Sequence, residues 1–154
     1  MRFTWLAPLV FLITSCSGQP PAPALPPFQA TVSMHDLMNN VLDPAADEIW
    51  ESVGTVITVD GTFEKAPSTE DEWAGLKGSA MRLAESGNLL LLPSRSGGNP
   101  DWIKYSLAMI EQSNRALKAA EAKDKDAIFT IGGDIYDACT NCHKQFDQAI
   151  ASVR

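Results

Sequence analysis

The stretch Cys139-Thr140-Asn141-Cys142-His143 lies near the C-terminus of this 154-residue chain and has the spacing C-x-x-C-H. In a helix, the two cysteines and the histidine stand at positions i, i+3 and i+4, so the three side chains project from one face. This pattern is typical of covalent haem c attachment, in which the thiols add to the vinyl groups and the imidazole binds iron. The five residues alone leave two alternatives open, a C-x-x-C redox pair and half of a zinc site.

Residues 1–15 have the features of a signal peptide. Arg2 precedes an apolar run over residues 3–13, which is shorter than the ~20 residues that cross a bilayer. The run ends in Ile13-Thr14-Ser15-Cys16, which resembles the lipobox of bacterial lipoproteins. The resemblance implies that Cys16 is acylated and that the chain is a membrane-anchored lipoprotein of the bacterial periplasm. An ordinary signal peptide with an incidental cysteine is the alternative.

Residues 16–31 are expected to form a linker between the lipid and the folded domain. The part from 17 to 27 contains five prolines, which favour an extended spacer. Of the three cysteines in the chain, Cys16 is assigned to the lipid, so Cys139 and Cys142 remain as a pair. Export brings them to an oxidising compartment, and the chain contains neither a second C-x-x-C nor a thioredoxin-like βαβ pattern. These observations favour haem attachment over the redox and zinc interpretations.

The charge of the chain restricts its partners. Without residues 1–15 it has 19 acidic and 11 basic residues, a net charge of −8. Such an acidic chain is unsuited to nucleic acid, and a charged partner would more readily be basic. Residues 32–154 are enough for one hydrophobic core. The sequence contains no Ser/His/Asp set and no phosphate-binding loop, so we do not expect an enzyme.

Apolar residues recur at helical spacing in four stretches, and sustained β-type alternation is absent. The first helix is expected over residues 32–58, the second over 69–91, the third from residue 100 and the fourth after residue 124. The apolar face of the first helix contains Met34, Met38, Val41, Ala45, Ile49, Val53 and Val56, and that of the second contains Trp73, Leu76, Ala80, Leu83 and Ala84. The apolar face of the third contains Trp102, Ser106, Met109, Ser113, Ala116 and Ala120, and that of the fourth contains Ile128, Ile131, Ile135, Ala138, Cys142, Phe146 and Ile150.

Local signals mark where these helices start, bend and end. Pro44 is expected to kink the first helix or to end its first segment. Residues 93–98 read as a loop. Gly132 and Gly133 weaken the fourth helix by ~1 kcal/mol each relative to alanine, a cost justified by close approach to another helix or a cofactor, although a plain bend is equally compatible. The expected caps are Thr69 with Glu72, Asn99 with Pro100, and Asp124 or Asp126.

Four amphipathic helices of about 20 residues with short connections predict an all-α, up-down-up-down four-helix bundle over residues 32–154. The C-x-x-C-H turn lies on the inward face of the last helix. A macrocycle attached there would be buried between helices, and the residues of the opposite helices would line its other face.

At this point the chain resembles the cytochrome c′ family, including its low-spin, methionine-ligated relatives. The stretch from Ala138 to Phe146 resembles the family's attachment site on the last helix, the Pro100-Asp101-Trp102 opening resembles that of its third helix, and Leu37-Met38 resembles the position facing the distal side of the haem. The resemblance implies one covalent haem c in a four-helix bundle, and a possible homodimer. Asp147 departs from the pattern, because many members have a basic residue there.

The second axial ligand decides between two functions. His143 is expected to bind iron on the proximal side, and Met38 is the candidate distal ligand. If Met38 binds iron, the haem is six-coordinate and suited to electron transfer. If Met38 only packs in the core, the five-coordinate iron could bind NO or CO.

The favoured interpretation is therefore a membrane-tethered c-type cytochrome that transfers electrons in the periplasm to or from an unidentified redox partner. The alternative is a five-coordinate haem protein that binds or sequesters NO or CO, and a third is a structural lipoprotein with an inert motif. A bis-histidine site with His35 is a weaker expectation than a solvated or propionate-contacting His35. The residues expected to serve mainly in packing are Met34, Met81, Met109, Trp50, Trp73 and Trp102.

Overall fold

The computed structural model describes residues 27–147. Cys16, the expected signal peptide and most of the expected linker lie outside these residues. About 72% of the described part is helical, and four helices have seven or more residues. This composition agrees with the predicted all-α class, and a two-stranded antiparallel hairpin is added to it.

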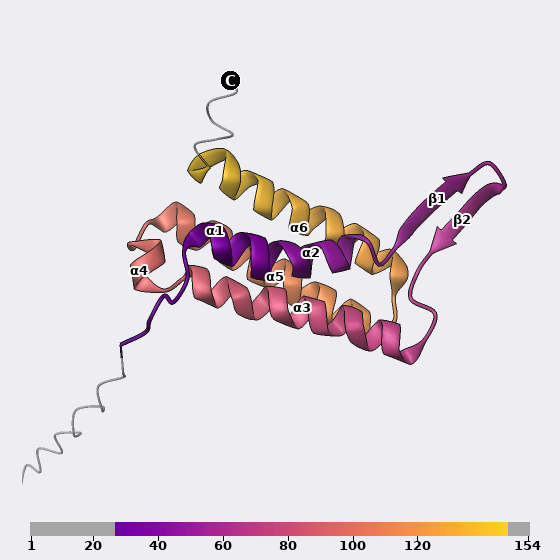
Figure 1. Cartoon of the computed structure of the whole chain (residues 1–154), viewed down its shortest axis with the longest axis horizontal. Helices are drawn as coiled ribbons and strands as arrows, with labels where there is room; N and C mark the ends of the chain where they lie inside the picture. Colours follow the sequence, from indigo (N-terminus) through magenta and orange to yellow (C-terminus); the bar gives the residue numbers. More distant parts are fainter. Residues whose placement is uncertain (1–26, 148–154) are drawn as a thin grey trace, which may run out of the picture.

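The elements follow one another in a simple order (Figure 1). A π-helical turn, η1, joins the first two α-helices, so that α1, η1 and α2 form one continuous rod, here called the α1–α2 rod. The helical segments are α1 (Met34–Leu37), η1 (Met38–Leu42), α2 (Asp43–Trp50), α3 (Glu70–Leu90), α4 (Pro93–Ser96), α5 (Pro100–Ala122) and α6 (Lys125–Phe146), and the strands are β1 (Gly54–Thr58) and β2 (Gly61–Lys65).

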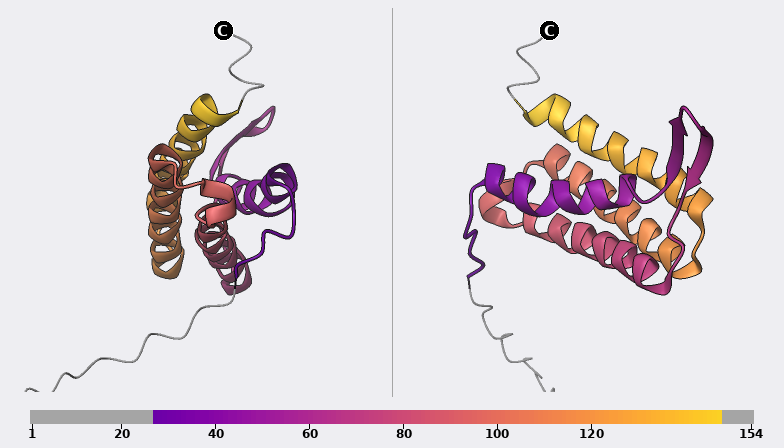
Figure 2. Two further views of the ribbon diagram at one scale, coloured as in Figure 1. Left: turned by 90° about the vertical axis from the view of Figure 1, so that its left-hand side faces the viewer. Right: turned by 45° about the vertical axis from the view of Figure 1, so that its right-hand side comes forward.

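The helices enclose one hydrophobic core. α3 packs along α5, α5 packs along α6, and α2 contacts both α3 and α6. Seen from the end, the α1–α2 rod and α5 lie on opposite sides, with α3 and α6 between them (Figure 2). The most deeply buried apolar side chains come from the rod, α3, α5 and α6, and include Leu37, Ile49, Leu83, Ala116, Ile128 and Ile135. Within residues 27–147, every helix is too short or too polar to span a bilayer.

The expected N-terminal caps of α3, α5 and α6 are confirmed. The Thr69 hydroxyl accepts from the backbone N–H of Glu72, and the Glu72 carboxylate accepts from the backbone N–H of Thr69, which completes a capping box. Asn99 caps α5, which begins with Pro100 as predicted. Of the two candidates for α6, Asp124 is the cap, because its carboxylate accepts from a backbone N–H of the first turn.

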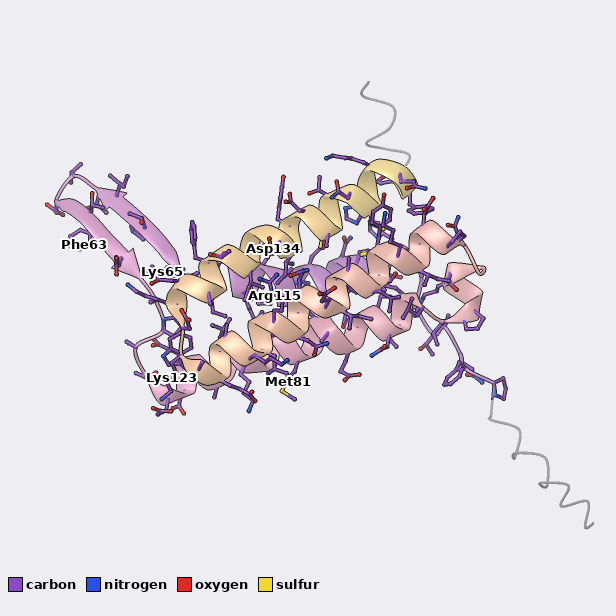
Figure 3. The ribbon with its side chains drawn as sticks, turned by 180° about the vertical axis from the view of Figure 1, so that it is seen from behind. Phe63, Lys65, Met81, Arg115, Lys123 and Asp134 are labelled. Atoms are coloured by element: carbon purple, nitrogen blue, oxygen red, sulfur yellow. The ribbon has the colours of Figure 1, made fainter. Side chains whose placement is uncertain are left out.

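The predicted first helix, residues 32–58, is too long. α2 ends at Trp50, and a β-hairpin follows in which Thr58 pairs with Gly61. β1 contains consecutive β-branched residues, which favour strands because their side chains are restricted in helices. Gly61 has φ +138°, a conformation that other residues rarely adopt. The hairpin projects from the end of the α1–α2 rod, and Phe63 lies on its exposed part (Figure 3).

The expected loop over residues 93–98 needs a correction, and one residue of the expected fourth helix lies outside the described chain. The expected loop over residues 93–98 contains the short helix α4, which ends at Ser96 and is followed by Gly97 with φ +54°. Pro93 lies in the first turn of α4, where its missing N–H costs nothing. α6 ends at Phe146, and Ile150, expected on its apolar face, lies outside the described residues.

Candidate functional site

The C-x-x-C-H motif lies on the last two turns of α6, as predicted. Cys139, Cys142 and His143 are all half-buried, and both cysteines are free thiols. All three residues line the same cavity, so the fold brings the motif to one space.

This space, here called the inner cavity, has a volume of about 210 Å³ and lies between the α1–α2 rod, α3, α5 and α6. Its lining is mostly apolar, with two tyrosines and one carboxylate. The residues around it are Met38, Leu42, Asp43, Ala46, Trp50, Leu83, Leu90, Tyr105, Ser106, Met109, Tyr136, Ala138, Cys139, Thr140, Cys142 and His143.

A second space, the outer cavity, has a volume of about 400 Å³ and lies between α1, η1, the start of α5 and the end of α6. It is lined by Met34, His35, Met38, Asn39, Asp43, Trp102, Cys142, His143, Phe146 and Asp147. Four residues, Met38, Asp43, Cys142 and His143, line both cavities. The two cavities therefore adjoin one another, and together they form a cleft between the α1–α2 rod and α6.

Aromatic contacts hold the motif-bearing end of α6 against α5. The ring centroid of Phe146 lies 5.1 Å from that of Trp102 and 6.4 Å from that of Tyr105, both in edge-to-face geometry. The Trp102 indole donates to the carbonyl of Leu90 at 2.8 Å, which fixes the ring orientation. Gln145 donates to the Asp101 carboxylate at 2.9 Å. The last turn of α6 is thus anchored to the first turn of α5.

Trp50 provides the second attachment of α6. Its indole donates to the carbonyl of Gly132 at 2.8 Å. A Cβ atom at Gly132 would lie 3.3 Å from Cδ1 of Trp50, so glycine permits the close contact between α2 and α6. The expected close approach at the Gly132-Gly133 pair is therefore confirmed for Gly132. A Cβ atom at Gly133 would meet nothing within 4 Å.

The surroundings of both thiols disfavour their ionisation. Burial raises the pKa of Cys139 to about 11, with smaller contributions from the negative charges of Asp43 and Cys142, and burial also raises the pKa of Cys142. The motif lies near the C-terminal end of α6, where the helix dipole disfavours a thiolate. Redox-active C-x-x-C pairs require a lowered pKa. The electrostatics therefore oppose the redox-pair interpretation of Cys139 and Cys142.

The candidate ligand Met38 and the three methionines expected mainly in packing occupy four different environments. Met38 is half-buried and lines both cavities, Met34 lines only the outer cavity, and Met109 is buried and lines only the inner cavity. Met81 is exposed on α3 and points away from the cleft (Figure 3). Met38 therefore shares both cavities of the cleft with His143, whereas Met34 and Met109 each share only one of them.

His35 and two of the three tryptophans considered above lie at the cleft, and the third tryptophan lies at the core. His35 is exposed at the outer cavity, and its ring nitrogens lie 3.1 and 3.3 Å from the side-chain amide of Asn39. Trp50 lines the inner cavity and Trp102 the outer one, whereas Trp73 packs against the core.

Sequence reasoning missed three polar groups of the cleft. Asp43 lines both cavities, and its negative charge contributes to the raised pKa of Cys139, while Tyr105 and Tyr136 line the inner cavity. Tyr105 lies three residues after Trp102, a helical spacing that could have placed it on the same face. Asp43 lies five residues after Met38, a spacing that no α-helical pattern brings to one face.

Asp147, where the family pattern has a basic residue, follows the last turn of α6. Its backbone N–H donates to the carbonyl of His143 at 2.8 Å, and it lines the outer cavity. Within residues 27–147, no group of three or more His, Cys, Asp or Glu side chains is arranged to hold a metal ion. Comparison of the chain with protein-family models, curated proteins and solved structures gives no significant match.

Proposed function

We propose that this chain is a membrane-tethered c-type cytochrome that carries one covalent haem c and transfers electrons in the bacterial periplasm. Cys139 and Cys142 would hold the haem through thioether bonds, and His143 and Met38 would bind its iron. The main support is that Met38 and His143 line both halves of one cleft, with both cysteines on its α6 wall.

The residues of the cleft fit a haem in chemistry and position. The inner cavity offers an apolar surface for the porphyrin, and the outer cavity is more polar, as the propionate edge requires. The free thiols of Cys139 and Cys142 would each add across a vinyl group, with the sulfur bonding to one carbon and the thiol proton going to the other. The half-buried side chains of His143 and Met38 are an imidazole and a thioether, the kinds of ligand that c-type iron binds.

The attached haem would supply a one-electron couple between ferrous and ferric iron. The protein's contribution is to fix its surroundings. Trp50 and Trp102 each donate a hydrogen bond from the indole to a backbone carbonyl at 2.8 Å, which holds the cleft walls in place. The buried side chains of Leu83 and Ala138 would give the porphyrin an apolar contact surface. Fixed walls of this kind would keep the geometry of the site similar in both oxidation states.

The proposal includes an up-down-up-down four-helix bundle. It is supported by the contacts of α3 with α5, of α5 with α6, and of α2 with both α3 and α6. The tether rests on the lipobox-like sequence at Cys16, which lies outside the described residues.

The optical spectrum of the protein, purified after expression with haem attachment, tests the proposal. We expect haem to remain on the chain after acid-acetone extraction, and the reduced protein to show sharp low-spin bands that CO does not alter. The variant Met38→Ala should become high-spin and bind CO, because it loses the distal ligand. Met81→Ala is the matched control, since Met81 is exposed on α3 and should leave the spectrum unchanged.

Two other results of this experiment would refute the proposal, each in a different way. A wild-type protein whose broad high-spin spectrum shifts on addition of CO would support a five-coordinate protein that binds NO or CO and would refute the electron carrier. A chain that retains no haem after extraction, despite expression with the attachment machinery, would refute both functions.

A further inference from the structure

The candidate ligand Met38 is the first residue of the π-helical turn η1. In this turn the backbone N–H of Asp43 donates to the carbonyl of Met38, five residues earlier, instead of to the residue four earlier as in an α-helix. Single π-turns inside α-helices are rare and occur frequently at functional sites.

Pro44 explains why the helix widens at this point. Proline has no backbone N–H, and in an α-helix its ring would clash with the carbonyl four residues earlier, here that of Asn40. A wider turn moves this carbonyl away from the ring, and α2 then begins with Pro44 in its first turn, where proline is tolerated. The Asn40 side chain donates to the carbonyl of Asp36 at 2.9 Å, so the transition from α1 to η1 keeps this backbone acceptor satisfied.

The widened turn changes which side chain enters the core. Leu37 and Leu42 are 1% and 4% exposed, although they stand five positions apart in the chain. A regular α-helix continued backward from Leu42 would bring the residue four earlier, Met38, to the same face. With the π-turn, Leu37 takes the core position, and Met38 is half-buried against the cleft.

We propose that Pro44 is a positioning residue for the distal ligand: through the π-turn it keeps Leu37 in the core and presents Met38 to the cleft. This inference rests on the proposed haem-binding function. It adds that the placement of Met38 depends on a one-residue change of helical register, imposed by a proline six residues further along the chain.

The inference is tested by a substitution and a compensating deletion. In Pro44→Ala the rod can become a continuous α-helix, which turns Met38 into the core and removes it from the cleft. Adding deletion of the exposed Asn40 restores a spacing of four between Leu37 and Leu42, so that Met38 returns to the cleft in a regular helix. Pro67→Ala, in the connection before α3, is the control.

For the haem-loaded proteins we expect Pro44→Ala to lose the methionine-to-iron charge-transfer band and to bind CO. The double variant should recover the band and resist CO, and Pro67→Ala should resemble the wild type. General destabilisation by Pro44→Ala would not be corrected by removing another residue. A Pro44→Ala protein that keeps the band, or a double variant that fails to recover it, would overturn the inference.

Crystal structures of the wild type and Pro44→Ala separate this inference from the proposed function. We expect Met38 in the cleft of the wild type and in the core of Pro44→Ala, whichever ligands the iron has. If the wild type is high-spin while Met38 still moves as expected, ligation by Met38 fails and the positioning role of Pro44 stands. If Met38 stays in the cleft of Pro44→Ala, the positioning role fails and the proposed function stands.

Discussion

Replacing Gly87 by alanine should weaken the packing of α3 against α5, the most extensive helix contact in the described chain. Gly87 is buried in α3, and a Cβ atom there would lie 2.3 Å from Cγ1 of Ile110 and 3.1 Å from Cε of Met109. The Ile110 contact is with an inner atom of the side chain, so rotation of a flexible end cannot relieve it. The matched variant is Gly75→Ala in the same helix, where a Cβ atom would meet nothing within 4 Å.

The two substitutions should change stability in opposite directions. Alanine is favoured over glycine in a helix interior by ~1 kcal/mol, and Gly75→Ala should gain up to about this amount. At Gly87 the same gain is opposed by an overlap of about 1.2 Å relative to normal carbon contact distances, and overpacking of this kind costs about 1–3 kcal/mol or more. An overlap of this size places the cost at the upper end of that range, so we expect a net loss of about 2 kcal/mol for Gly87→Ala.

Urea unfolding followed by far-ultraviolet circular dichroism measures both effects, provided that wild type and variants are compared in the same state of haem attachment. The expected result is a midpoint above that of the wild type for Gly75→Ala and below it for Gly87→Ala, with similar slopes. If Gly87→Ala were as stable as Gly75→Ala, α3 and α5 could not approach as closely as described. The cleft would then also change, because Met109 contacts this position and lines the inner cavity.

Two further predictions concern the walls of the cleft. Trp50→Phe removes the indole hydrogen bond to a backbone carbonyl of α6 and should lower the free energy of unfolding by about 1–2 kcal/mol in the same urea assay; an unchanged midpoint would contradict this role. In the folded, haem-free chain, Cys139 should react with iodoacetamide at pH 8 about 100-fold more slowly than an ordinary thiol, because burial raises its pKa from 9.0 to about 11. The rate should rise with pH toward 11, and the stability of the haem-free chain should fall over the same range, since the unfolded thiol ionises first; equal rates in the folded chain and in urea would show that the thiol is not buried.

The features that could be predicted from sequence are those decided within one helical turn. The caps at Thr69, Asn99 and Asp124 follow from a side chain that accepts a hydrogen bond from a backbone N–H two or three residues later. The common face of Cys139, Cys142 and His143 likewise follows from a spacing of three and four. Both kinds of inference require only that the local segment is helical.

The hairpin was not predicted because its sequence fits both the apolar spacing of a helix and the composition of a strand. Val53 and Val56 continue the apolar spacing of α2, which led to a helix predicted through residue 58. The same stretch has the β-branched composition of a strand, and Gly61 permits the turn. Periodicity alone could not decide between them, since the strands are largely exposed and make little use of the apolar core.

The π-turn explains both why Asp43 lies in the cleft and why Met38 lies on that side of the rod. An α-helical pattern assigns Met38 to the apolar face with Ala45 and Ile49, whereas in the structure Met38 is half-buried against the cleft. The π-turn shifts the register, so Leu37 is buried while Met38 and Asp43, five residues apart, line the same cleft. Pro44 was interpreted as a kink or as the end of the first helical segment, and neither interpretation predicts a change in register. A proline near a candidate ligand on a helix should therefore be tested for a register shift before the ligand is assigned to a face.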